Sequence, residues 1–106
     1  MKYYIISYVV ASDDFWTGVD FYNPADVETG VKIQVQRYSN GTISNNIEVV
    51  VGPKLHYILA PTEIAKNLNE PDGRAALLIT CSDNVMITPA NNWGGVLIPK
   101  EVESFE

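Results

Sequence analysis

Each of the two tryptophans of the chain follows residues whose side chains can form hydrogen bonds. An indole ring combined with such groups can recognise a ligand. The face of an indole ring stacks on a sugar ring, while nearby amide and carboxylate groups bond the sugar hydroxyls. Loops suit such binding because a rigid scaffold positions their side chains. The alternative is that both tryptophans fill the ends of a small domain or a contact between subunits. The candidate ligand-binding residues are Trp16, Trp93, Asn91, Asn92, Asp13 and Asp14.

The residues that hydrolases use are sparse in this sequence. His56 is the only histidine and Cys81 is the only cysteine. A Ser-His-Asp or Cys-His hydrolase needs a histidine base beside its nucleophile, and no Gly-x-Ser-x-Gly motif is present. Cys81 ends an apolar run, which predicts a buried thiol, and His56 falls on the polar side of its segment. We therefore expect a protein that is not an enzyme, and a small hydrolase is the least favoured alternative.

Metal and cofactor sites are not indicated either. One histidine and one cysteine cannot supply the usual ligands of zinc. The acidic residues lack the alternating loop of an EF-hand, and spacing alone does not pair any two of them across a cleft for glycoside hydrolysis. We expect solvated turn carboxylates, with no metal and no cofactor. The acids concerned are Asp13, Asp14, Asp20 and Asp26.

The composition argues against several classes of partner. The 106 residues carry a net charge of −6, and the seven Lys and Arg residues are scattered. Nucleic acids and anionic membranes both require clustered basic residues, so neither is expected to bind. No segment reaches the roughly 18 apolar residues of a membrane span. The apolar start at 2–11 is shorter than a secretory signal of about 15–30 residues, so we expect a cytoplasmic protein.

The elements that must position these residues are β-strands. Apolar and polar residues alternate from 31 to 36 and again from 47 to 51. This period of two is typical of strands with one buried and one solvated face. Between them, Asn40 and Gly41 predict a type I′ turn, whose two central residues take positive φ. The segment 31–51 is therefore predicted to be a β-hairpin, which places the chain in the antiparallel β class.

Similar patterns recur along the chain, separated by turn signals. A short helical segment is expected near 63–68, with Thr62 as its N-cap and with Ile64 and Leu68 on one face. We expect an all-β fold: a single antiparallel β-sandwich or jelly-roll-like domain of about eight strands over residues 1–106, with an acidic tail at 100–106 that frays. A barrel is the main alternative. The other expected strands are 2–11, 15–22, 55–60, 74–82, 85–88 and 96–98.

The block 15–24, Phe-Trp-Thr-Gly-Val-Asp-Phe-Tyr-Asn-Pro, resembles the opening of small bacterial β-sandwich modules. The layout that follows is similar to the soluble sensory rhodopsin transducer family over roughly residues 15–90. The resemblance implies a jelly-roll-like sandwich that is not an enzyme, often forms a symmetric homo-oligomer and binds a ligand or partner. The chain departs from that family between residues 11 and 15, where the family has a longer Gly- and Pro-rich segment. The matching segments are 22–25, 31–51, 52–53, 75–82 and 83–85.

Two functions follow from these observations. The favoured one is a structural or protein-interaction subunit whose apolar strands associate into a homo-oligomer. The alternative is a module that binds carbohydrate or another polar small molecule through the tryptophan loops. The solvated face of the hairpin, formed by Lys32, Gln34 and Gln36, lacks aromatic side chains. A ligand is therefore expected at the tryptophan loops rather than on the hairpin.

Overall fold

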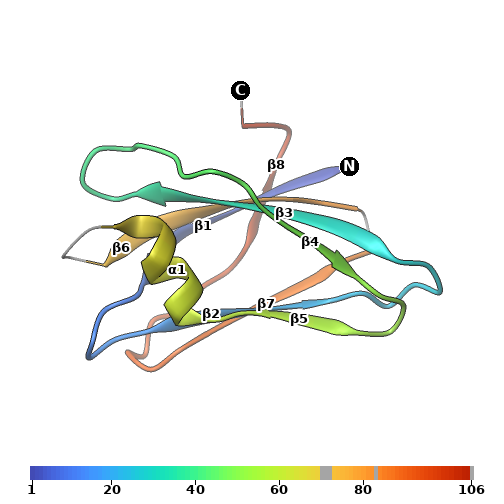
Figure 1. Ribbon diagram of the computed structural model, residues 1–106, viewed down its shortest axis with the longest axis horizontal. Coiled ribbons are helices and arrows are strands. Elements are labelled where there is room, and N and C mark those ends of the chain that lie inside the picture. Colours follow the sequence, from blue (N-terminus) through green and yellow to red (C-terminus); the bar gives the residue numbers. More distant parts are fainter. Residues whose placement is uncertain (70–72, 83, 106) are drawn as a thin grey trace.

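The computed structural model describes residues 1–69, 73–82 and 84–105, which form two stacked antiparallel sheets with a helix at one end (Figure 1). The larger sheet has the strand order β4-β3-β6-β1-β8, and the smaller has the order β5-β2-β7. The expected β-sandwich of about eight strands with one short helix is confirmed. The elements are β1 (Lys2–Val10), β2 (Thr17–Tyr22), β3 (Thr29–Arg37), β4 (Ile47–Val51), β5 (His56–Leu59), α1 (Pro61–Leu68), β6 (Arg74–Cys81), β7 (Met86–Asn91) and β8 (Lys100–Val102).

The core lies between the two sheets, because each sheet turns its apolar face inward. On β3, Val31, Ile33 and Val35 are buried, as the alternation predicts, and on β2 the buried residues include Val19 and Phe21. Removing such side chains from water is the main favourable contribution to folding. The largest fully buried side chains are Phe21, Ile6, Ile33, Leu59, Ile64, Leu68, Leu77 and Ile79.

The helix α1 connects the smaller sheet to the larger one and closes one end of the core (Figure 1). Its inward face carries Ile64 and Leu68, both fully buried, at the expected spacing of four residues. The expected N-cap at Thr62 is wrong: the helix begins at Pro61, because proline fits the first helical position, where no N–H is needed. Glu63 of this helix also acts on Tyr57 of β5. Partial burial is the larger cause and the Glu63 carboxylate the smaller cause of a raised pKa of the Tyr57 hydroxyl. No helix in the described ranges is long and apolar enough to cross a membrane.

The hairpin predicted at 31–51 is present, but its connection differs from the expected turn. Strands β3 and β4 pair with Val31 opposite Val49 and Ile33 opposite Ile47. The chain reverses through residues 38–41, where the N–H of Gly41 donates to the carbonyl of Arg37 at 2.9 Å. Only Gly41 has positive φ in this loop, so the expected type I′ turn is wrong. A longer loop needs only one left-handed residue, and glycine adopts that conformation most easily.

The last two strands also differ from the expected boundaries. Strand β7 continues through Pro89 to Asn91, and proline is tolerated there because β7 is an edge strand. The strand expected at 96–98 is wrong, and β8 instead spans Lys100–Val102 and pairs with the start of β1. Fraying is therefore wrong for Glu101 and Val102, which lie opposite Tyr4 and Tyr3. Charged residues suit this edge position because they discourage further pairing.

Candidate functional site

Trp93 is held in a loop by the side chain of Asn91, the last residue of β7. The Asn91 Oδ1 accepts hydrogen bonds from the backbone N–H groups of Trp93 and Gly94, each at 3.0 Å. Its Nδ2 donates to the carbonyl of Gly95 at 2.8 Å. A Cβ added to Gly95 would lie 1.9 Å from Cζ3 of Trp93, so the indole ring packs directly on this backbone. The loop therefore presents Trp93 in one fixed position.

The ring of Trp93 belongs to a row of side chains that we call the aromatic cluster: the rings of Trp93, Tyr8 and Tyr38, with the guanidinium of Arg74 beside the last of them. Trp93 meets Tyr8 edge to face, with centroids 5.7 Å apart, and Tyr8 meets Tyr38 in the same way at 5.8 Å. The guanidinium of Arg74 lies 4.5 Å from the centroid of Tyr38. Both geometries are favourable for aromatic quadrupoles and for a cation on an aromatic face.

A cavity of about 270 Å³ opens beside this cluster, and we call it the aromatic pocket. Phe15, which is 50% exposed, forms another of its walls. Arg74 is the one charged residue among the described residues that line it. The lining residues are Tyr8, Val10, Ser12, Phe15, Arg74 and Trp93.

The second tryptophan loop is tied to the first by Asn92. The Asn92 Oδ1 accepts from the backbone N–H of Trp16 at 2.8 Å, and its Nδ2 donates to the carbonyl of Asp14 at 3.0 Å. The N–H of Asn92 also donates to the carbonyl of Trp16 at 3.3 Å. The two loops therefore lie side by side, joined by an amide whose oxygen and nitrogen are both already bonded.

The predicted ligand-binding residues lie in different places and make different contacts. Trp93 lines the aromatic pocket, whereas Trp16, 41% exposed, does not. Asp13 lines a separate hollow of about 210 Å³ beside α1, and Asp14 is exposed. The amides of Asn91 and Asn92 hold the loops. The two tryptophans thus do not share one cavity, and ligand binding by these residues stays a prediction.

His56 lies on the outer face of the smaller sheet in contact with two residues of β2. Its Nδ1 is 2.9 Å from each carboxylate oxygen of Asp20, and its ring stacks on Tyr22 with centroids 4.5 Å apart. The expected exposure of His56 is confirmed, as is the burial of Cys81. Because Cys81 points into the core from the larger sheet, it is not placed to act with this histidine as a nucleophile.

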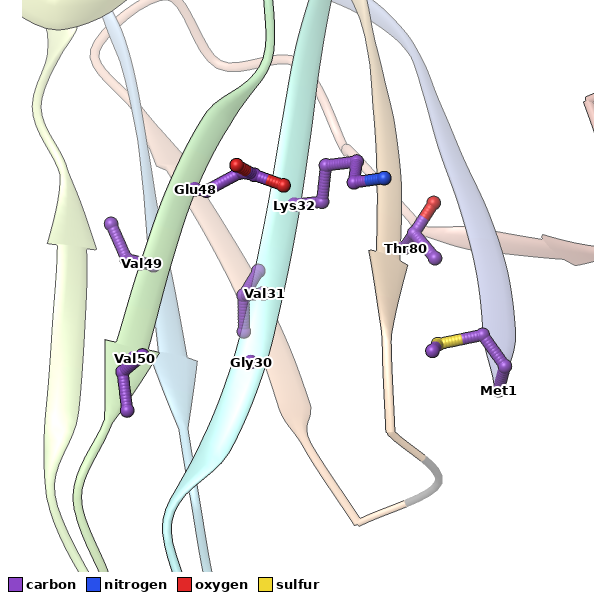
Figure 2. Close-up of a pocket in the computed structure, with 8 residues that line it drawn as sticks. All are labelled: Met1, Gly30, Val31, Lys32, Glu48, Val49, Val50 and Thr80. Carbon is purple, nitrogen blue, oxygen red and sulfur yellow. The ribbon is translucent and has the colours of Figure 1, made fainter.

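A second cavity, of about 350 Å³, lies over the hairpin, where the sequence favoured no site. Gly30 has no side chain there, and a Cβ added to it would meet no atom within 4 Å. Figure 2 shows Val50 of β4 and Met1 on either side of Gly30, with Lys32, Glu48 and Thr80 above them. We call this hollow the hairpin groove. Its exposed apolar residues are Met1, which is 79% exposed, and Val50, which is 68% exposed.

The strand β4 that borders the hairpin groove is an edge of the larger sheet, and no strand in the described ranges pairs with its outer side. The backbone N–H of Arg37 donates to the carbonyl of Thr42, and the N–H of Ser44 donates to the carbonyl of Val35. The N–H and C=O groups of the odd-numbered residues of β3 therefore point toward β4. Their partners on β4 are also odd-numbered. The N–H and C=O groups of Glu48 and Val50 therefore point outward, available to another strand.

Sequence patterns missed these surfaces for identifiable reasons. Tyr8 and Tyr38 are far from Trp93 in sequence and come together only when β1 and β3 flank β6. The hairpin groove depends on a missing side chain at Gly30, next to an exposed Val50. A glycine at an outward strand position beside a run of valines is the one local signal that could have indicated it.

The chain is thus a two-sheet antiparallel β-sandwich with a helix at one end. Its fold is that of a solved structure named the Anabaena sensory rhodopsin transducer, with a TM-score of 0.66 and 15% sequence identity. The match covers 82% of this chain and 91% of that one. The resemblance noted in the sequence is therefore confirmed at the level of the fold. No family model matches the chain, and no curated protein matches it in sequence.

Proposed function

We propose that this protein is a non-enzymatic interaction module that associates with a second copy of itself through β4. The observation that carries the proposal is the open edge of β4 beside the hairpin groove. The strand reads Ile-Glu-Val-Val-Val, with no proline and no lysine to discourage pairing. An edge of this kind is a template for another strand, and its outward backbone groups gain hydrogen bonds when one is added.

The sequence of β4 favours its own copy as the partner. In an antiparallel pair centred on Val49, Glu48 of each copy lies opposite Val50 of the other. These are the residues whose backbone groups point outward, so each pair can exchange two hydrogen bonds. A pair centred on Glu48 instead would oppose two like charges, which is unfavourable. The two hairpin grooves would then lie on either side of the shared edge, with each Val50 near the centre of the contact.

Such a contact is small, so we expect weak association. Interfaces that bury little area are transient, and a dissociation constant of about 10–100 µM is the expected range. The protein should then be mostly monomeric at low micromolar concentration and mostly dimeric near millimolar concentration. Sedimentation equilibrium over this range measures the constant directly.

A charge swap at Val50 tests both the surface and its register. Val50→Glu places a second carboxylate opposite Glu48 of the other copy and should weaken association at least tenfold. Val50→Lys places an ammonium opposite the same Glu48 and should leave association within about threefold of the natural protein. Within one copy, both side chains project from an exposed position, so folding should not change.

Ile58→Glu is the matched control, because Ile58 is exposed on β5, an edge strand of the other sheet. It should associate like the natural protein. The proposal is wrong if the protein is a monomer at all concentrations, or if Ile58→Glu weakens association as much as Val50→Glu does. Equal loss for Val50→Glu and Val50→Lys would overturn the register centred on Val49.

A further inference from the structure

A further cavity, of about 400 Å³, lies on the outer face of the larger sheet, beside the segment that follows β8. Figure 1 shows this last segment, in red, on the side of the larger sheet that faces away from the smaller one. We call the cavity the tail pocket. Its lining residues include Tyr3 of β1, Lys32 and Gln34 of β3, Asn46 before β4, Thr80 of β6 and Phe105 of the last segment.

Aromatic rings reach the tail pocket from outside the hairpin. The solvated face of the hairpin has none of its own, but Tyr3 and Phe105 both line the tail pocket and are half-buried. Their rings meet edge to face, with centroids 5.3 Å apart. Such a contact covers one face of one ring, so it leaves other ring faces to stack on a flat ligand.

Several polar side chains of the tail pocket form no hydrogen bond and no ion pair with the described residues. They carry an ammonium, two amides and a hydroxyl, and they belong to Lys32, Gln34, Asn46 and Thr80. The amides of the tryptophan loops are, by contrast, bonded to the backbone. The polar groups of the tail pocket are therefore available to a ligand, both as donors and as acceptors.

Lys32 gives the tail pocket a positive charge although the protein is acidic overall. It lies between Glu48 of β4 and Thr80 of β6. Figure 2 shows its side chain extending away from Glu48 toward Thr80. The described residues that line the tail pocket include no carboxylate. An ammonium in this setting favours an anionic group, and lysine binds phosphate as a point charge.

From these observations we infer that the tail pocket binds a nucleoside monophosphate. The base lies against the rings of Tyr3 and Phe105, and the amides of Gln34 and Asn46 bond the donors and acceptors on its edge. The phosphate accepts hydrogen bonds from the ammonium of Lys32.

The size and charge of the tail pocket suit this class of ligand. A volume of about 400 Å³ lies within the range of small-molecule pockets. A single phosphate needs one cation, whereas a nucleic acid needs a row of them, which this chain lacks. A neutral sugar would leave Lys32 without a partner, and an acidic sugar would have no flat ring for Tyr3 and Phe105. The inference does not depend on the association through β4.

The test is a saturation-transfer NMR titration of adenosine 5′-monophosphate, which observes the ligand and needs only about 10 µM protein. The protein is then mostly monomeric, so association through β4 does not contribute. We expect a dissociation constant on the order of 1 mM, with the base protons receiving more saturation than the ribose protons. Adenosine lacks the phosphate, and ribose 5-phosphate lacks the base. Each should bind about tenfold more weakly, and so should glucuronate, an acidic sugar.

Substitutions at Lys32 identify the group that binds the phosphate. Lys32→Gln should weaken adenosine 5′-monophosphate about tenfold and leave adenosine unchanged. Lys32→Arg keeps the charge and should bind the monophosphate within about threefold of the natural protein. Lys66→Gln is the matched control, because Lys66 is exposed on α1 and does not line the tail pocket. It should bind both probes like the natural protein.

Phe105→Ala tests the aromatic wall and keeps the inference testable if a Lys32 variant does not fold, since Phe105 lies outside the core cluster. It should weaken the monophosphate and adenosine alike, by about threefold or more. Three results would overturn the inference. They are no saturation transfer to about 20 mM adenosine 5′-monophosphate, glucuronate binding as tightly as the monophosphate, and equal losses in Lys32→Gln and Lys66→Gln.

Discussion

At the scale of single residues, the side chain of Asn23 links distant segments of the chain through several polar contacts. It is fully buried, and its Nδ2 lies 2.8 Å from the carbonyl of Val27, 3.0 Å from that of Val51 and 3.1 Å from that of Gly52. Its Oδ1 accepts from the N–H of Ala25 at 3.0 Å. One side chain thus joins the end of β2 to the end of β4, and so connects the two sheets.

Replacing Asn23 with alanine should therefore be costly. Asn23→Ala leaves buried carbonyls without a donor, and each such group costs about 1–3 kcal/mol. We expect a loss of about 2–4 kcal/mol in the free energy of unfolding, measured by urea denaturation. Asn46→Ala, at an exposed loop position, is the control and should change stability by less than about 0.5 kcal/mol. A loss of under about 1 kcal/mol for Asn23→Ala would mean that water replaces the amide.

Asn23 shows what the sequence can predict about a single residue and what it cannot. The turn at Asn23-Pro24 is evident, since both residues favour turns. Its bonds to Val51 and Gly52 are not, because those residues lie 28 and 29 positions away. The same holds for Asn92, which is 76 positions from Trp16. Local patterns indicate that an amide is present, but only the packed sheets determine which backbone groups it reaches.

At the scale of elements, alternation predicted the strands well where one face is buried. Residues 31–35 are in a strand as expected, because burial of every second residue fixes its register. Residues 74–81 are also in a strand, as their apolar run predicted, and there Leu77, Leu78 and Ile79 are all buried. The short apolar run at 96–98 misled because Val96 and Ile98 are exposed and only Leu97 packs on the core. Strand β8 is short and charged, so its position depends on β1 and leaves no pattern of its own.

The hairpin itself allows a test in which stability and association change in opposite directions. Gly30 lies in β3 opposite Val50, and its φ is not in the left-handed region. Gly30→Val should fill the hairpin groove without a clash and raise the free energy of unfolding by about 0.5–1 kcal/mol, because glycine is unfavourable within strands. It should also weaken association about threefold or more by crowding Val50 at the proposed contact.

Thermal unfolding and sedimentation equilibrium on the same sample separate these two effects. A variant that is more stable yet associates less cannot be explained by misfolding. Gln34→Val is the control, since Gln34 is also an outward residue of β3 but lies outside the hairpin groove. Unchanged association in Gly30→Val would exclude the hairpin groove from the contact between copies.

At the scale of the whole molecule, the sandwich leaves two edges on each sheet, and these are not equivalent. Strand β8 carries Lys100 and Glu101, and β7 contains Pro89, so both have features that discourage pairing. Strand β4 contains no proline, and its one charged residue is Glu48. The sequence shows which strands are apolar, but it does not show which of them become edges. That depends on the strand order, which brings β3, β6 and β1 inside the larger sheet.

The net charge of −6 predicts how association should respond to salt. Two like-charged copies repel, and the Debye length of about 30 Å at 0.01 M salt is comparable to the molecular extents of 40 × 30 × 22 Å. At about 0.15 M salt the screening length falls to about 8 Å, so the repulsion is largely removed while the contacts at β4 persist. We expect the association constant to rise about threefold to tenfold between these conditions, measured by sedimentation equilibrium. Val50→Lys should show a smaller rise, because salt also screens its attraction to Glu48 of the other copy. If association of the natural protein weakens with salt, attraction between charged groups drives the contact and the apolar edge of β4 does not.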